Sequence, residues 1–304
     1  NPGEDARLYN AVKAISDFAI ALGINIPTGK DSLSMTQKYP GGDLVYAPGT
    51  VIISTVSAVS DVRKVISPAL LPVAGSSLYY IDMTKGGFHL GGSSFAQLLN
   101  LLGKETPELD DPDYFIRAFD AVQELIQQEM ILSGHDVASG GLITSLLEMT
   151  FPDNRTSLDI DLNGFEEPDL IRILFSEKPG MLIQTDRETD IESLLGERQI
   201  SVTRVGEVQE GQTIRISKGD REYHLGKNEY RDLWFRTSYL MDRHQTAGEL
   251  ARERFENYRN HDLQYIFPAG FGSRLDDYAL SAQRKDQSGI RAAIIREKGV
   301  NGDR

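Results

Sequence analysis

The N-terminal part of the chain changes from a helical to a strand-like pattern of apolar positions. Residues 5–23, DARLYNAVKAISDFAIALG, repeat apolar side chains at helical spacing, and Gly23 is a typical stop signal. Residues 24–27, INIP, predict a short strand, and residues 50–59, TVIISTVSAV, are β-branched and apolar enough to predict a buried strand. A helix followed by strands on this scale indicates a layered α/β or α+β domain.

A second group of elements follows the connection SPALLPVAGS, whose two prolines mark a candidate domain boundary at about residue 73. Residues 114–132 have the spacing of an amphipathic helix, and residues 134–151 predict a turn and then a helix. Strand-like segments, one of them folded around a Lys-Pro-Gly turn, are 77–83, 157–162, 173–185, 200–208 and 213–219. These elements predict one mixed α/β domain.

The C-terminal part of the chain is more polar. It contains Trp234, the only tryptophan, and a charged stretch with helical spacing at residues 246–262. We expect a docked extension or a linker here. Residues 289–304, GIRAAIIREKGVNGDR, predict the first strand of a further domain. The chain opens in a patterned segment without Met and stops just after this strand-like run, so we expect both ends to be cut.

Composition narrows the class of protein. The chain has 304 residues, a formal net charge of −13 and no cysteine. An acidic surface of this size argues against a nucleic-acid groove but not against a small anionic ligand. Disulfides, thiolate catalysis and cysteine zinc sites are excluded. No apolar run reaches the roughly 18 residues of a membrane helix, and no signal peptide is visible. We therefore expect a cytoplasmic protein that spans no membrane.

The stretch IPTGKDSLSM, residues 26–35, is the first candidate for chemistry. Gly29 would permit close approach of a phosphate, Lys30 would supply a positive charge, and Ser32 would supply a hydroxyl group. Asp31 could share a magnesium ion with phosphate oxygens. Taken alone, the composition favours the alternative of a plain solvated turn.

The stretch GHDVASGG, residues 134–141, is the second candidate. We expect His135 and Asp136 at the mouth of a helix, where the helix dipole and free N–H groups favour anions. Asp136 could instead hold a metal ion that bridges to such anions. A helix-capping pair is the commoner arrangement for these residue types. Gly140 and Gly141 weaken that alternative, because glycines at a helix entry cost stability unless the backbone must approach something closely.

Two further stretches are given structural interpretations. GGFHLGGSSF, residues 86–95, has two glycine pairs that could cradle a phosphate, but tight packing against a sheet is the favoured reading. His89 is interpreted as a structural histidine. Glu177, in FSEKPG, is interpreted as a solvated carboxylate beside a turn.

Taken together, these stretches resemble the synthetase region of the phosphoribosylformylglycinamidine synthases, the large single-chain ligases of purine biosynthesis. The opening NPGEDARLYNAVKAI resembles that family's PGEDAxLYxAVKA segment, and IPTGKDSLSM resembles its IPxGKDSxSM turn. The later matches are GHDVASGGLITSLLEMTF, ILFSEKPGMLIQT, LWFRTSYLMDRHQ and IRAAIIREKGVNGD.

The resemblance implies an α/β (α+β) fold related to aminoimidazole ribonucleotide synthetase. Residues 1–72 would be the C-terminal part of a second N-terminal-type domain, and residues 73–225 a complete second C-terminal-type α/β domain. Residues 226–288 would form an extension or linker, and residues 289–304 the first strand of a truncated glutaminase domain. The implied partners are the missing synthetase repeat and the glutaminase domain of the same polypeptide.

The resemblance also implies a reaction and a set of site residues. ATP would activate the amide oxygen of formylglycinamide ribonucleotide, and ammonia from glutamine would displace the phosphate to give the amidine. It carries the ATP and substrate site onto Gly29, Lys30, Asp31 and Ser32. Asp136 is implied as a Mg2+ ligand at an auxiliary nucleotide site that holds ATP or ADP.

This sequence departs from the family pattern in the turn beside Asp136. Ala138 stands where the family has Ser, and Ser139 where it has Asp. Contacts to an auxiliary nucleotide would therefore pass to Ser139 or to the backbone. No catalytic residue is assigned within the chain, which is expected to be inactive alone. The alternatives are a non-catalytic nucleotide-binding or docking module, and another ATP-dependent member of the same superfamily.

Overall fold

The computed structural model describes residues 3–30, 36–47, 49–59, 61–257, 266–272 and 275–279. It divides into two compact units, residues 1–259 and 260–304. Within the described residues, no helix combines the length and the apolar character needed to cross a membrane.

The N-terminal segment begins with α1, Glu4–Leu22, as its apolar periodicity predicts. Gly23 ends the helix in the left-handed conformation, with φ 69°. A short antiparallel hairpin follows, with β1 at Thr36–Lys38 and β2 at Leu44–Tyr46. Phe18 of α1 packs edge-on against Phe115, with 5.9 Å between the ring centroids.

Two predicted strands of this segment are wrong. Residues 24–27 and 50–59 form no strand, and residues 50–59 are exposed rather than buried, up to Val56 at 100%. A β-branched run favours extended backbone, but a strand also needs a neighbour to pair with its N–H and C=O groups. The described residues provide no such neighbour for these two runs.

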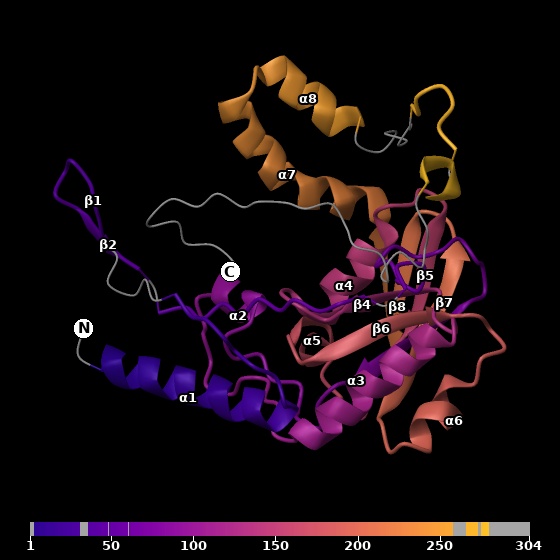
Figure 1. Ribbon diagram of the computed structural model, residues 1–304, viewed down its shortest axis with the longest axis horizontal. Helices are drawn as coiled ribbons and strands as arrows, with labels where there is room; N and C mark the ends of the chain where they lie inside the picture. The colour runs from indigo at the N-terminus through magenta and orange to yellow at the C-terminus, as the bar shows by residue number, and fades with distance from the viewer. Residues whose placement is uncertain are drawn as a thin grey trace. The chain divides into compact units, whose positions relative to one another are not determined.

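A mixed seven-stranded sheet forms the centre of the first unit (Figure 1), in the order β4-β6-β3-β7-β5-β8-β9. All neighbouring strands are antiparallel except β5 and β8, which are parallel. The strands are β3 Ser77–Asp82, β4 Ser133–Asp136, β5 Thr156–Asp161, β6 Gly180–Thr185, β7 Val202–Glu210, β8 Thr213–Lys218 and β9 Arg221–Gly226.

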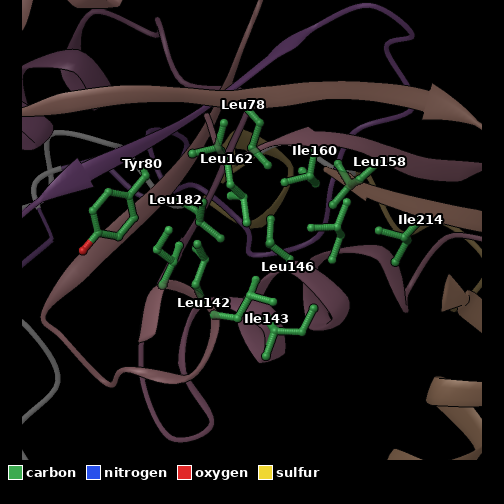
Figure 2. Packing of buried hydrophobic residues seen from close by; sticks show 14 of the residues in the cluster. Leu78, Tyr80, Leu142, Ile143, Leu146, Leu158, Ile160, Leu162, Leu182 and Ile214 are labelled. Atoms are coloured by element: carbon green, nitrogen blue, oxygen red, sulfur yellow. The ribbon is translucent and has the colours of Figure 1, made fainter. Parts of the chain in front are cut away.

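Two helical layers cover this sheet. The helices are α2 Ser94–Leu98, α3 Pro112–Gln127, α4 Gly141–Thr150, α5 Leu170–Phe175 and α6 Ile191–Gly196. Helices α4 and α5 contribute to the larger apolar cluster and α3 and α6 to the other. Figure 2 shows Leu142 and Leu146 of α4 turned toward strand residues such as Leu182. The α/β fold expected from the sequence is confirmed.

The strand predicted before the Lys-Pro-Gly turn is wrong at residues 173–175, which belong to helix α5. The Asp169 side chain accepts a hydrogen bond from the N–H of Ile171 at 2.9 Å and so caps a helix there. Strand β9 was not predicted, because REYHLG is a polar edge strand with only two apolar side chains, Tyr223 and Leu225. Its position is set by β8, from which it is separated by a two-residue turn at Gly219 and Asp220.

The connection before β3 is fixed to the sheet by the fully buried Gln184 of β6. Its Nε2 donates to the carbonyl of Leu71 at 2.9 Å and to Ser76 Oγ at 2.8 Å. Its Oε1 accepts from the N–H of Leu71 and from Ser133 Oγ, each at 2.9 Å. All the hydrogen-bonding capacity of this amide is therefore directed at the connection and the adjoining strand.

Helices α7, Lys227–Gln245, and α8, Gly248–Asn257, follow the sheet. Two buried cations hold the start of α7. Lys227 Nζ donates to the carbonyls of Asp153, at 2.7 Å, and Thr156. Arg231 Nη1 donates to the carbonyl of Phe151 at 2.9 Å. Burial, together with the positive charge of Arg231, lowers the pKa of Lys227 from 10.5 to about 8.

This lowered pKa predicts an alkaline gain in stability. Native Lys227 releases its proton near pH 8, whereas the unfolded chain keeps it to about 10.5. The contribution is thus fully present above 10.5 and lost as the pH falls through 8. We expect the free energy of unfolding to rise across this window by up to about 3 kcal/mol. Denaturant titrations at several pH values should show that Lys227→Met lacks this rise; an identical slope in both proteins would contradict the prediction.

The second unit is described only at residues 266–272 and 275–279. It contains a short 3-10 helix, η2, at Leu275–Tyr278. The rings of Phe267 and Phe271 stack with 4.7 Å between their centroids. The strand predicted at residues 289–304 lies outside the described residues.

Candidate functional site

The first predicted phosphate-binding turn follows α1 and is described as far as Lys30. Gly29 and Lys30 are exposed, and Asp31 and Ser32 lie outside the described residues. A Cβ added to Gly29 would meet no atom within 4 Å, so internal packing does not require a glycine there. The assignment of these four residues to ATP or substrate stays a prediction.

The second predicted turn connects β4 to α4. His135 and Asp136 are the last two residues of β4, paired with Leu182 and Met181 of β6, and are not at the start of the helix as expected. Strand pairing on this edge of the sheet therefore sets their positions. The Asp136 side chain is 73% exposed, whereas that of His135 is 17% exposed. Ala138 and Ser139 are also exposed within the turn.

Glycine geometry determines how α4 begins. The N-cap residue is Gly140, with φ 90°, and no side chain caps the helix, so the capping alternative for His135 and Asp136 is wrong. Gly141 has φ 76°, and a Cβ there would lie 2.7 Å from the carbonyl oxygen of Leu174. Both residues adopt a backbone conformation that side chains disfavour, and Gly141 also lets α4 approach the end of α5.

The interpretation of Glu177 as a solvated carboxylate is wrong, because its side chain binds backbone N–H groups. Its Oε1 accepts the N–H of Gly140 and the N–H of Ser94, each at 2.8 Å, so one carboxylate joins the starts of α4 and α2. Partial burial raises the pKa of Glu177, but the hydrogen bonds from Gly140 and Ser94 outweigh it and lower the pKa overall. Glu177 therefore supplies an internal negative charge at the N-terminus of α4.

A buried ion pair lies next to Glu177 in the sequence. Lys178 Nζ is 2.6 Å from Asp82 Oδ2, and the two side chains are only 4% and 14% exposed. The ammonium group also lies 4.5 Å from the centre of the Phe88 ring. Burial raises the pKa of Asp82, and the hydrogen bond and charge of Lys178 offset this only in part. Sequence reasoning missed the pair, because its members are 96 residues apart.

The glycine-rich stretch is closely packed as predicted, but against the non-strand segment at residues 103–108 rather than against the sheet. A Cβ at Gly91 would lie 2.3 Å from the carbonyl oxygen of Glu105, which accepts the Gly91 N–H at 2.8 Å. A Cβ at Gly86 would lie 3.1 Å from the carbonyl oxygen of Glu108. His89 Nδ1 is 3.3 Å from Glu105 Oε2. The glycines at these positions permit close approach of the following segment.

The described residues contain no group of three or more His, Cys, Asp or Glu side chains that could hold a metal ion. The protein therefore does not form a complete metal cage in these regions. Mg2+ commonly takes only one or two carboxylates and completes its shell with water and phosphate oxygens. The exposed carboxylate of Asp136 is of the kind that can supply one such ligand.

The fold belongs to the AIR synthase-like class. Residues 1–58 match the family described as "FGAR-AT PurM_N-like domain", and residues 73–218 match "AIR synthase related protein, C-terminal domain". The structure also resembles that of T. maritima PurL complexed with ATP, with a TM-score of 0.50 and 14% sequence identity. This likeness covers 71% of the chain and 34% of that chain, and it shows a shared fold.

Two curated relatives extend the comparison along the whole chain. The "Probable phosphoribosylformylglycinamidine synthase, chloroplastic/mitochondrial" of Arabidopsis thaliana is 34% identical over 99% of the chain. The human phosphoribosylformylglycinamidine synthase is 33% identical over 100% of it. The chain is therefore a homologue of phosphoribosylformylglycinamidine synthases along nearly its whole length. It spans 21% and 23% of the length of these two relatives.

Proposed function

We propose that the chain forms part of the synthetase region of an ATP-dependent ligase. The complete enzyme would convert formylglycinamide ribonucleotide, glutamine and ATP into formylglycinamidine ribonucleotide, glutamate, ADP and phosphate. The observation that carries this proposal is the 33–34% identity to phosphoribosylformylglycinamidine synthases along 99–100% of the chain. The fold shared with an ATP-bound PurL supports it. The remaining synthetase repeat and the glutaminase domain would be supplied by the same polypeptide, acting in the cytoplasm.

The β4–α4 turn would receive the phosphates of an auxiliary nucleotide. Asp136 would hold Mg2+, which when bound neutralises phosphate charge and fixes the phosphate oxygens. Ala138 brings no hydroxyl group, so contacts to the nucleotide would come from Ser139 and backbone N–H groups. The N–H of Gly140 already donates to Glu177, at 2.8 Å. The remaining groups of the turn, with the metal, would therefore hold the phosphate.

The segment after α1 would serve the ATP and substrate site. Gly29 would let a phosphate approach the backbone, Lys30 would balance its charge, and Ser32 would bind the substrate. Asp31 would contribute to a shared magnesium ion. The exposed position of Gly29 and Lys30 supports access by such a ligand.

Binding of Mg2+ and ATP to the whole chain tests the proposal. Asp136→Asn should weaken Mg2+-dependent ATP binding by about tenfold or more, because it removes the charged metal ligand. Asp220→Asn, a matched change at an exposed carboxylate in the β8–β9 turn, should leave the affinity unchanged. Isothermal titration with and without a chelator measures both. Equal affinities in the two variants would refute the role of Asp136.

The chain by itself is expected not to turn over, since it spans only 21–23% of the length of its two relatives above. Supplying ATP, Mg2+, formylglycinamide ribonucleotide and ammonia should release no phosphate above background. Sustained release would show that the chain contains a complete active site.

A further inference from the structure

Helix α7 contacts the core of the first unit through Trp234. The indole Nε1 donates to Glu148 Oε1 of α4 at 2.9 Å, and the ring meets Phe151 edge-on with 6.1 Å between centroids. Arg231 and Lys227, one and two turns earlier in α7, are bound to carbonyls of the segment that follows α4. Helix α7 is therefore held against α4 and the segment after it at several points.

The second oxygen of Glu148 continues the contact toward the turn after β4. Glu148 Oε2 lies 3.3 Å from His135 Nε2. The other ring nitrogen of His135, Nδ1, donates to the carbonyl of Asp136 at 2.6 Å and lies 3.5 Å from its Oδ1. Ser145 Oγ of α4 donates to the same carbonyl at 2.9 Å. The side chains of His135 and Glu148 are only 17% and 28% exposed, so water competes little with these contacts.

We propose that Trp234, Glu148 and His135 are positioning residues that transmit the docking of α7 to Asp136. We call these three residues the positioning chain. The inference rests on the proposed function, in which Asp136 holds a metal ion beside a nucleotide. Residues that hydrogen-bond to a metal ligand orient it, and their loss typically lowers metal affinity by about 10- to 100-fold.

Open space lies beside the positioning chain, including its end at Trp234. A cavity of about 490 Å³ lies along it, lined among others by Pro68, His135, Glu148, Arg231 and Trp234. Trp234 is itself 50% exposed, so part of its indole borders open space. Binding at Asp136 and the position of α7 should therefore influence each other, and thermodynamic linkage requires that influence to be reciprocal.

The test uses the whole chain and its single tryptophan. Adding Mg2+ and ATP should change Trp234 fluorescence, and Asp136→Asn should abolish the change. Glu148→Ala breaks the positioning chain and should weaken Mg2+-ATP binding by about tenfold. Glu148→Gln keeps an acceptor for the indole and can donate to His135 Nε2, so its affinity should stay within about twofold of the wild type. Equal affinities for Glu148→Ala and the wild type would overturn the proposal.

A measurement without nucleotide tests the positioning chain separately from the proposed nucleotide site at Asp136. Trp234→Phe keeps an aromatic ring against Phe151 but removes the N–H donor. It should shift the backbone amide NMR signals of residues 136–139, while Leu233→Ala, at the neighbouring exposed position, should leave them in place. Unmoved signals in Trp234→Phe would overturn the positioning chain even if ATP binds. Shifted signals in a chain that binds no ATP would support it and reject the proposed nucleotide site.

Discussion

Replacing Asp82 with alanine is expected to lower the free energy of unfolding by about 3–5 kcal/mol. The substitution leaves the ammonium group of Lys178, only 4% exposed, without the carboxylate that lies 2.6 Å away. The Phe88 ring attracts the ammonium but cannot replace a full negative charge. Equilibrium denaturation in urea or guanidinium chloride measures the loss.

The double variant Asp82→Ala with Lys178→Met is the control. It removes both charges and leaves a flexible apolar side chain that packs well beside an aromatic ring. Replacing both members of a buried pair with apolar groups is often nearly neutral, so the double variant should recover most of the stability. A decrease of less than about 1 kcal/mol in the free energy of unfolding for Asp82→Ala alone would show that water reaches Lys178 and that the ion pair is accessible to solvent.

Replacing Gly141 with alanine is expected to cost about 3 kcal/mol or more, since it combines two penalties. The backbone is left-handed, with φ 76°, and the new Cβ would lie 2.7 Å from the carbonyl oxygen of Leu174. That oxygen belongs to the backbone of α5, so rotation of a side chain cannot relieve the overlap. The same denaturation measurement applies.

Gly219→Ala separates the two penalties. Gly219 also has positive φ, 60°, but a Cβ there would meet nothing within 4 Å. It should therefore show only the conformational cost, about 1–2 kcal/mol. Equal losses at Gly141 and Gly219 would mean that α4 can move away from α5 without cost.

The sequence predicts well the elements whose own residues determine them. Helix α1 has regular apolar spacing and ends at Gly23 as expected, and strands β3, β7 and β8 have the predicted apolar composition. Predictions failed where distant partners decide the outcome. Residues 50–59 have the composition of a strand but no pairing neighbour among the described residues. Helix α5 is an exception, because its N-cap Asp169 is a local signal in the sequence that was not recognised.

The sequence singled out the residues of the candidate site, but it revealed neither their place at the end of β4 nor their contacts. The motif GHDVASGG led to Asp136, and the structure places that carboxylate at an exposed strand end. The motif did not reveal that Glu177 accepts the N–H of Gly140, 37 residues away. Nor did it indicate that Trp234 contacts Glu148 across 86 residues of sequence. Helical and strand periodicities describe neighbours along the chain, whereas these contacts depend on how the elements pack.

The Glu177 carboxylate accepts hydrogen bonds from both Ser94 and Gly140. It therefore couples the two glycine-rich segments that lead into α2 and α4. If Glu177 rotates away, the N–H groups at both helix starts lose their acceptor in one event. The β4–α4 turn is therefore stabilised in part by Glu177, a residue outside both segments. An anion that displaced the Glu177 carboxylate from this position would therefore also remove the acceptor of the Ser94 N–H at the start of α2.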